Sequence, residues 1–277
     1  MPKSLKYDKN LPLYLASGRR FALQDALACI EAAFAQNKPV LIYLHGRAAG
    51  KGEPKRSVKD GTYAALQAYG AAVIGFTWDA DDNGYDIQRP LAIKAGFVQF
   101  LDLLAQFVAA KALALPSLLA HSMGNLLIAD LANEGYFLAQ ASAQQPAPPR
   151  FNHIVLVAPA LKSKDHHQWL GQIQAARQVY VTYNQYDRIL LALGVVTFAA
   201  MLGKKLALPL AVSATVQYVD IGDLRVNHHY FVPSGQENKK NLTTFFATAL
   251  RGQSVDLATL ARPVQLNGVT VFRLING

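Results

Sequence analysis

The chain has 277 residues, 52% of them apolar, so it is long enough to bury a large core within one globular unit. Lys and Arg outnumber Asp and Glu by 27 to 18, which gives a formal net charge of +9 at pH 7. The basic residues are scattered and no basic helix is interleaved with aromatic residues, so nucleic acid is not expected as a partner. A positive charge instead favours anionic partners by long-range attraction, or serves as a solvated surface that aids solubility.

Cysteine content and the first residues favour a reducing compartment. Cys29 is the single cysteine, so no disulfide can form within the chain, and we expect it to be a small buried residue. The apolar stretch near the start is short and broken by Pro12, which is too little for the hydrophobic region of a signal peptide. The longest apolar run, residues 189–202, is well short of the ~20 residues that a membrane-spanning helix needs. We therefore expect a cytoplasmic protein, although export without a cleavable signal would leave no mark in the sequence.

The first clear elements are a helix and a buried strand. Residues 21–34 place their apolar side chains on one helical face, and the pattern stops before Asn37. A continuous aliphatic and β-branched run follows at residues 39–46, which is typical of a strand buried on both faces of a parallel sheet. Similar runs recur five times along the chain. They are residues 71–78, 116–122, 151–159, 178–184 and 215–222.

Helical patterns lie between these strands, at residues 91–108, 124–138 and 189–202. Strands that alternate with helices predict an α/β fold with right-handed crossovers. We therefore expect a mostly parallel central sheet of about six core strands, flanked by helices.

The end of the chain has the pattern of a hairpin. Asn267-Gly268 separates two strand-like segments, and this pair suits a type I′ turn. We expect a single domain over residues 1–277, with a core at about 38–251 and a C-terminal extension at about 252–277.

A sharp turn around a serine is the strongest chemical signal. In a parallel sheet, catalytic groups collect where strands end at their carboxyl edge. Ala120-His121-Ser122-Met123-Gly124 lies at such an end, between a predicted strand and a predicted helix. Small residues two positions before and after a serine let the chain turn sharply and expose the hydroxyl, and Ala120 adds only one methyl to the usual glycine. The pattern predicts Ser122 as a nucleophile, with the backbone N–H of Met123 as one donor of an oxyanion hole.

The first clear strand ends in His45-Gly46-Arg47. In sites of this kind the second oxyanion donor comes from the loop after that strand, so we expect it to be the backbone N–H of Arg47. Four residues near these strand ends are candidates for lining a substrate pocket. They are His45, Gly46, His121 and Trp78.

An acid and a base follow later strands. Asp187 comes directly after one buried strand, and the pair His228-His229 follows the last. Serine, acid and histidine in this chain order are expected for a serine nucleophile carried on such a sheet. A neutral imidazole takes the serine proton near neutral pH, while the acid fixes its tautomer. We expect His228 as base and Asp187 as acid. The alternatives are His229 for the base, and Asp165 or Asp220 for the acid.

The remaining histidines are expected to serve the structure. They are His121, His153, His166 and His167, of which His121 also lines the pocket. The pair His166-His167 lacks the helical or strand spacing of two metal ligands. No metal is expected.

These motifs together resemble the α/β-hydrolase superfamily, and in detail a bacterial branch of unknown function. The matching segments are YLHG, GFTWDADDNGY, AHSMGN, VLVAPAL, YNQYDRIL and NHHYF, which span about residues 38–231. The resemblance implies hydrolysis of an ester, thioester or amide through an acyl-enzyme, without a metal or an organic cofactor. Its pattern of a histidine, a small or polar residue and a tyrosine places the base on His228, and it places the acid on Asp187.

Two departures from the family pattern stand out. Relatives often carry Asp where this chain has Ala160, which removes a competing acid. The superfamily's first two strands are expected to be absent or degraded, because only some twenty residues precede the first helix.

We therefore expect a carboxylesterase or lipase-like enzyme whose partner is a small-molecule or lipid ester. A non-catalytic binding or scaffold protein of the same fold is the alternative. A phosphate-binding loop at residues 46–52 is disfavoured, because the segment is one residue short and lacks the Ser or Thr that holds magnesium.

Residues 189–205 are the candidate for contact with a membrane. We favour a buried helix there, but the apolar run and its final Lys204-Lys205 are also compatible with a cap over the site or with peripheral contact to an anionic membrane. A cluster of basic residues in the loop after the first strand is compatible with recruitment of an anionic substrate. These residues are Lys51, Lys55, Arg56 and Lys59.

Overall fold

The computed structural model describes residues 13–15, 20–21, 23–46, 62–76, 88–138, 151–236 and 238–277. Within these ranges, strands form one sheet of ten in the order β2-β1-β4-β3-β5-β6-β7-β8-β10-β9. Their bounds are β1 Leu13–Leu15, β2 Arg20–Phe21, β3 Val40–Leu44, β4 Ala72–Phe76, β5 Ser117–His121, β6 Phe151–Val157, β7 Ala176–Tyr183, β8 Val216–Asp220, β9 Ala261–Leu266 and β10 Val269–Leu274. The predicted α/β fold is confirmed, with a wider sheet than the six core strands expected.

Strands β3 to β8 are the six that the sequence predicts, and all neighbours among them pair in parallel. β3, β5 and the last five residues of β6 are buried along their length, as their unbroken aliphatic composition requires in a sheet covered on both faces. The parallel run continues into β10, which pairs with β8. The carboxyl ends of these strands therefore meet at one edge of the sheet.

The two ends of the sheet are antiparallel. β1 pairs with β4 and β2 pairs with β1, and these two strands have only three and two residues. At the other end, β9 and β10 form the predicted hairpin. Asn267 and Gly268 have φ of 49° and 78°, and the type I′ turn needs a positive φ at both positions.

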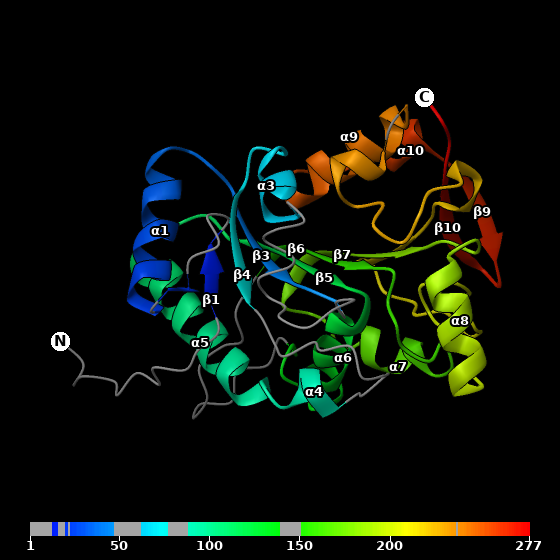
Figure 1. Cartoon of the computed structure of the whole chain (residues 1–277), viewed down its shortest axis with the longest axis horizontal. Coiled ribbons are helices and arrows are strands. Elements are labelled where there is room, and N and C mark those ends of the chain that lie inside the picture. The colour runs from blue at the N-terminus through cyan, green and yellow to red at the C-terminus, as the bar shows by residue number, and fades with distance from the viewer. Residues whose placement is uncertain are drawn as a thin grey trace.

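Helices cover both faces of the sheet (Figure 1). α3 and α9 lie on one face, whereas α5 and α6 lie on the other. The helices are α1 Leu23–Ala35, α3 Thr62–Gln67, α4 Gln88–Leu91, α5 Lys94–Ala110, α6 Asn125–Asn133, α7 His166–Leu170, α8 Arg188–Thr197, α9 Lys240–Leu250 and α10 Leu257–Leu260, with short 3-10 turns η1 Ser122–Gly124, η2 Gly222–Leu224 and η3 Pro233–Gly235.

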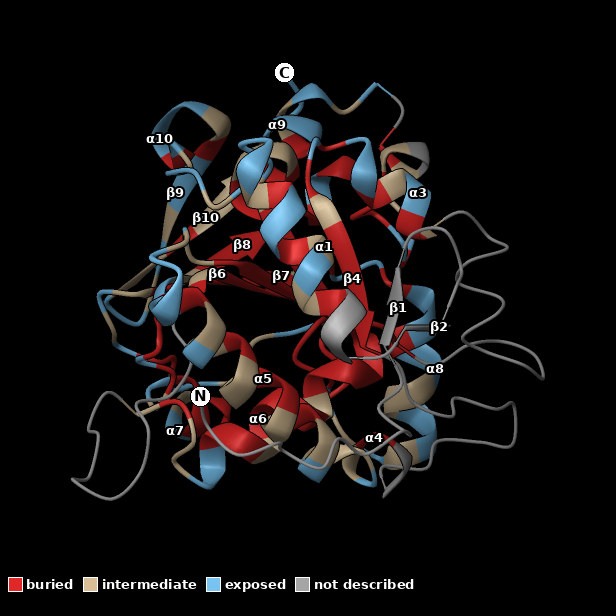
Figure 2. Ribbon diagram, turned by 90° about the vertical axis from the view of Figure 1, so that its left-hand side faces the viewer, coloured by how far each residue is buried: buried red, intermediate tan, exposed pale blue. Residues whose placement is uncertain are grey.

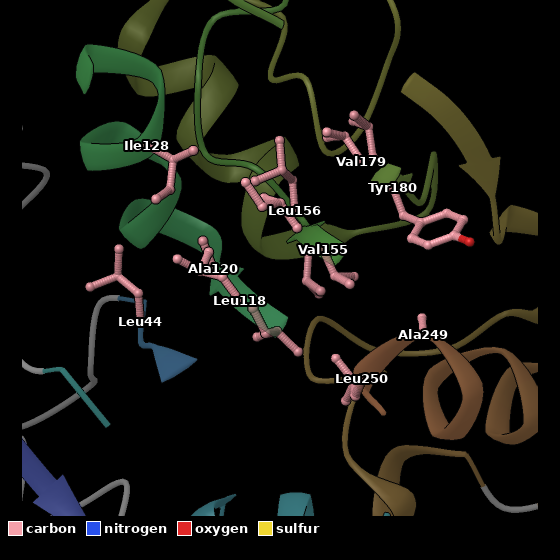
Figure 3. Packing of buried hydrophobic residues seen from close by; sticks show 14 of the residues in the cluster. Leu44, Leu118, Ala120, Ile128, Val155, Leu156, Val179, Tyr180, Ala249 and Leu250 are labelled. Carbon is pink, nitrogen blue, oxygen red and sulfur yellow. The ribbon is translucent and has the colours of Figure 1, made fainter. Parts of the chain in front are cut away.

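The core lies between the sheet and these helices, and Figure 2 shows the central strands as buried. On one side of the sheet, Ile128 of α6 faces Ala120 and Leu156 (Figure 3). On the other, Ala249 of α9 lies below Tyr180 (Figure 3). This alternation along the strands places apolar side chains on both faces, so the sheet is held between two layers of helices.

One predicted element differs in its surroundings. Residues 189–202 were expected to form a buried helix, but the helix α8 covers Arg188–Thr197 and has Leu190 as its one buried residue. The expectation is wrong because an apolar run records composition and not whether a partner covers it. Cys29, expected to be buried, is half-buried. None of the described helices has both the length and the apolar character needed to cross a membrane.

Buried histidines contribute to this core as neutral groups. The His166 ring donates from Nδ1 to the Ser163 carbonyl at 2.6 Å and accepts at Nε2 from the Tyr218 hydroxyl at 2.9 Å. The His153 ring donates from Nδ1 to the Ala249 carbonyl at 2.8 Å. Burial lowers the pKa of both rings, because the charged imidazolium is poorly solvated there.

We predict that acid destabilises the protein through these rings. The unfolded chain binds protons below about pH 6.5, the ordinary pKa of histidine, whereas the folded rings with lowered pKa do not. Their contribution to the free energy of unfolding is therefore complete above that pH, and it is lost as the pH falls toward the folded values. Urea unfolding at about pH 7.5 and about pH 5.5 measures the effect.

His166→Gln isolates one ring. The substitution removes a titrating group and also damages the packing, so it destabilises the protein at both pH values. The loss relative to the wild type should be smaller at about pH 5.5, where the wild type no longer gains from the neutral ring. An equal loss at the two pH values would contradict the assignment.

Candidate active site

The parallel register brings together the strand ends that precede the predicted site residues. Leu44 of β3 pairs with Ala120 of β5, His121 of β5 with Val157 of β6, and Val157 with Thr182 of β7. The segments that follow these strands therefore leave the sheet from the same edge. Ser122 follows β5 directly at this edge.

The backbone turns at Ser122 into a conformation that few residues adopt. Its φ is +51°, in the left-handed region, which costs roughly 1–2 kcal/mol for a residue that is not glycine. The turn passes directly from β5 through η1 into α6, as the strand-turn-helix pattern predicts. A β-carbon at Gly124 would lie 2.6 Å from the carbonyl oxygen of His45, so only glycine fits there without a shift. The sharp turn thus depends on small neighbours.

Hydrogen bonds to the Ser122 carbonyl hold this strained turn. The side-chain amide of Asn125 donates to the Ser122 carbonyl at 2.9 Å and to the Val157 carbonyl at 3.2 Å. The backbone N–H of Ala160 donates to the same Ser122 carbonyl at 3.2 Å. The end of β6 therefore braces the turn at the end of β5.

The end of β3 packs closely against the turn. A β-carbon at Gly46 would lie 2.7 Å from Cβ of Ser122 and 3.0 Å from Nδ1 of His121. His45 is buried and donates from Nδ1 to the Gly46 carbonyl at 2.6 Å. Of the residues predicted for the pocket, the structure thus brings Gly46 and His121 to Ser122, and the His45 carbonyl to Gly124 in the same turn.

Arg47 and Trp78 lie outside the described residues, as do most of the glycine-rich segment 46–52 and the basic cluster of Lys51, Lys55, Arg56 and Lys59. Met123 is buried in η1 directly after Ser122, at the start of the turn that leads into α6.

His228 and Asp187 form a buried pair. His228 donates from Nδ1 to Oδ2 of Asp187 at 2.6 Å, and the side chains are 6% and 0% exposed. The other carboxylate oxygen of Asp187 accepts from the backbone N–H of Leu190 at 3.0 Å, which caps the start of α8. One carboxylate therefore fixes both the imidazole ring and the first turn of a helix.

His121 holds the segment of His228 against the serine turn. Its Nε2 donates to the His228 carbonyl at 3.3 Å, and the two rings lie 4.8 Å apart between centroids. Burial lowers the pKa of His121 well below its usual value, and the neighbouring histidines His228 and His229 add to the effect. His121 is therefore a neutral donor at neutral pH.

The alternative base and the alternative acids considered from the sequence have other surroundings. His229 is exposed, with its ring 5.1 Å from that of His121. Asp220 pairs with Arg273 at 2.9 Å and accepts from the Gly222 N–H. Asp165 is exposed at the start of α7. Within the described part of the chain, no group of three or more His, Cys, Asp or Glu is placed to hold a metal ion.

Tyr230 is a residue whose position the sequence argument did not anticipate. Its buried hydroxyl accepts from the backbone N–H of Ala158 at 2.9 Å and lies 2.7 Å from the hydroxyl of Thr182. Ala158, directly after β6, has a φ of +44°, a second left-handed residue beside Ser122. The tyrosine therefore ties the His228 segment to the ends of β6 and β7. Its only trace in the sequence is its place two residues after His228.

The parallel sheet, the left-handed serine between strand and helix, and the later acid and histidine define an α/β-hydrolase fold. Residues 33–234 of the chain match the model of a family of this class. The chain belongs to that family, described as "Alpha/beta hydrolase of unknown function (DUF900)". No curated protein matches the chain significantly.

Solved structures with distant similarity include two esterases. The apo form of Thermogutta terrifontis esterase 2 is 12% identical, with a TM-score of 0.43 over 87% of this chain and 89% of that one. Esterase B from Lactobacillus rhamnosis is 14% identical, with a TM-score of 0.42 over 77% and 76%. A predicted CIB-like hydrolase from Thermoplasma acidophilum is 15% identical, with a TM-score of 0.37 over 76% and 87%.

We predict that the Tyr230 hydroxyl positions His228. Tyr230→Phe leaves the Ala158 N–H without its acceptor, which should cost about 1–3 kcal/mol of stability. It should also broaden or shift the proton NMR signal of the Nδ1–H between His228 and Asp187.

Tyr218→Phe is the matched control, because that hydroxyl is also buried and accepts from a backbone N–H, that of Ala211, at 2.9 Å. It should destabilise the protein by a similar amount and leave the His228 signal unchanged. A His228 signal in Tyr230→Phe identical to that of the wild type would refute the positioning role.

Proposed function

We propose that this protein is a serine esterase that cleaves carboxylic esters through an acyl-enzyme on Ser122, with His228 as general base and Asp187 as its partner. The 2.6 Å hydrogen bond between His228 and Asp187, buried against the serine turn, carries the proposal. A carboxylate only accepts, so the proton lies on Nδ1 of His228. Its Nε2 then keeps the lone pair that takes the serine proton.

The proposed reaction has two halves. The Ser122 oxygen attacks the ester carbonyl while Nε2 of His228 takes its proton, and the resulting imidazolium protonates the departing alcohol. A water molecule, activated by the same nitrogen, then attacks the acyl-enzyme and releases the acid. Asp187 stabilises the imidazolium in both halves, and no metal or organic cofactor takes part in this scheme.

The tetrahedral oxyanion is proposed to accept from the backbone N–H groups of Met123 and Arg47. Each such donor typically stabilises the transition state by about 2.7–4 kcal/mol. His45, Gly46 and His121 are proposed to line the pocket with Trp78. The substrate class proposed is a small-molecule or lipid ester.

We predict that Ser122→Ala abolishes esterase activity. A series of p-nitrophenyl esters with increasing acyl length measures turnover and the chain length that the pocket accepts. A fluorophosphonate probe should label the wild type and not Ser122→Ala, because the probe reacts with an activated serine.

Ser213→Ala is the control, since Ser213 lies in a loop and its hydroxyl bonds the side chain and the backbone N–H of its neighbour Thr215. It should keep wild-type turnover. A folded wild type that neither turns over any ester nor accepts the probe would favour a non-catalytic binding protein of this fold.

The acid and the base are tested separately. Asp187→Asn should lower turnover by about 10⁴-fold, because the amide no longer fixes the tautomer or stabilises the imidazolium. Asparagine is as good a helix cap as aspartate, so the start of α8 should survive and the fold should be retained.

His228→Gln should reduce turnover by a comparable factor, whereas His229→Gln, at the exposed neighbour, should have little effect. Turnover in the linear range, with unfolding curves for each variant, gives the comparison. Loss of activity in His229→Gln with retention in His228→Gln would reverse the assignment of the base.

A further inference from the structure

Exposed apolar side chains are concentrated in one stretch of the chain. Eight large hydrophobic residues are exposed among the described residues, and all of them fall between positions 186 and 212. They are Tyr186, Ile189, Leu191, Val195, Val196, Phe198, Leu208 and Val212. Single exposed apolar residues are normal on a protein surface, but a local concentration indicates an interaction site. We call residues 186–212 the apolar segment.

The helix within this segment has its apolar side outward. α8 buries Leu190, while Val195 and Val196 are 66% and 70% exposed. An amphipathic surface helix normally turns its apolar side to the core and its charges to water. α8 stands at the outside of the fold (Figure 1), so this face is available to a partner.

Phe198 ends the helix and projects from it. The side chain is 96% exposed, and the backbone φ of +50° is unusual for a bulky residue. The helix closes just behind it, where the Ala199 N–H donates to the Gly194 carbonyl at 3.0 Å. A large aromatic ring is thus exposed to solvent, and it contributes no buried apolar area to the fold.

The exposed charges of the apolar segment are all basic, because its one acidic residue, Asp187, is buried. No Asp or Glu occurs from residue 188 to residue 219, whereas Arg188, Lys204 and Lys205 are basic. Lys204 donates to the Gln185 carbonyl at 2.7 Å, which places its ammonium group at the start of α8. Arg225 lies over the ring of Tyr186 at 3.6 Å, adding a further cation beside the apolar segment.

We propose that the apolar segment docks on the surface of an anionic phospholipid membrane. Apolar side chains beside basic groups are the combination that binds such a surface, because the former enter the acyl boundary and the latter attract the headgroups. The net charge of +9 acts in the same direction. The short helix would lie in the plane of the interface rather than cross it.

The proposed docking rests on the exposed apolar side chains and the basic groups, and it does not require the proposed esterase activity. It bears on that activity through Asp187, which caps α8 and bonds His228. A membrane held at α8 would lie near the proposed site, which suits an ester drawn from the lipid phase. Binding and turnover are therefore measured separately.

Vesicle flotation tests the proposal. The intact chain is mixed with vesicles of equimolar phosphatidylglycerol and phosphatidylcholine, and in parallel with vesicles of phosphatidylcholine alone. We expect binding to the anionic vesicles to be at least tenfold stronger. It should weaken when salt rises from about 0.1 M to about 1 M, because screening then acts over roughly 3 Å instead of 10 Å.

The apolar contribution is tested by the triple variant Val195→Ser, Val196→Ser and Phe198→Asn. All three side chains are exposed, and asparagine tolerates the left-handed backbone at position 198, so the fold should be retained. Binding should fall at least tenfold. The fluorophosphonate reaction and the unfolding curve of this variant verify that the rest of the molecule is intact.

The charge contribution has a matched pair of variants. Lys205→Gln removes an exposed cation of the apolar segment and should weaken binding about fivefold. Lys240→Gln removes an exposed cation from α9, which covers a face of the sheet far from α8 in Figure 1, and should leave binding unchanged.

Three results would overturn the proposal. The first is a wild type that does not float with anionic vesicles. The second is a triple variant that binds as the wild type does. The third is a wild-type dimer that binds no vesicles and dissociates in the triple variant, because a second copy would then cover the apolar segment.

Discussion

The left-handed backbone at Ser122 is the constraint around which the rest of the site is arranged. A serine in this conformation is unfavourable by itself, so the surrounding chain must hold it. Gly124 lets α6 begin against the carbonyl groups of Leu44 and His45, and Gly46 leaves room beside the serine β-carbon. Each of these contacts depends on β3 and β5 ending level with each other, which the parallel register ensures.

A second left-handed residue, Ala158, stands at the end of the next strand. Asn125 joins the two turns by donating to the carbonyls of Ser122 and Val157. Gly203 packs so closely on Ala158 that a β-carbon there would lie 2.4 Å from its carbonyl carbon. Through Tyr230 the same turn is bonded to the segment that carries His228. Two strained turns and a buried hydroxyl thus form one connected frame.

The sequence was sufficient for elements with a strong local pattern. β3 to β8 follow from their unbroken apolar runs, and the hairpin follows from Asn267-Gly268, because both signals lie within a few residues. The short β1 and β2 carry little pattern of their own; β1 owes its place to pairing with β4, and β2 owes its place to pairing with β1. Arg47 and Trp78 remain predictions, since both lie outside the described residues.

Contacts between distant segments could not be read in the same way. The bond from Tyr230 to Ala158 joins residues 72 positions apart, and no periodicity encodes it. The exposure of α8 was missed for a similar reason, because whether an apolar helix is covered depends on what packs on it. The pairing of Asp187 with His228 agrees with their order along the chain, because the fold restricts which strand ends meet, whereas their joint action with Ser122 stays a prediction.

Asp187 joins a surface helix to a buried ring through a single side chain. One oxygen accepts from the Leu190 N–H and the other accepts from His228. The carboxylate therefore cannot rotate to improve one of these hydrogen bonds without changing the other. The length of the side chain must therefore suit both hydrogen bonds, the one to Leu190 and the one to His228. Glutamate would reach a histidine from further back but is a poor residue for beginning a helix, whereas aspartate meets both demands. A displacement of the first turn of α8 would therefore move the carboxylate that orients the imidazole, and a displacement of the imidazole would move the start of α8.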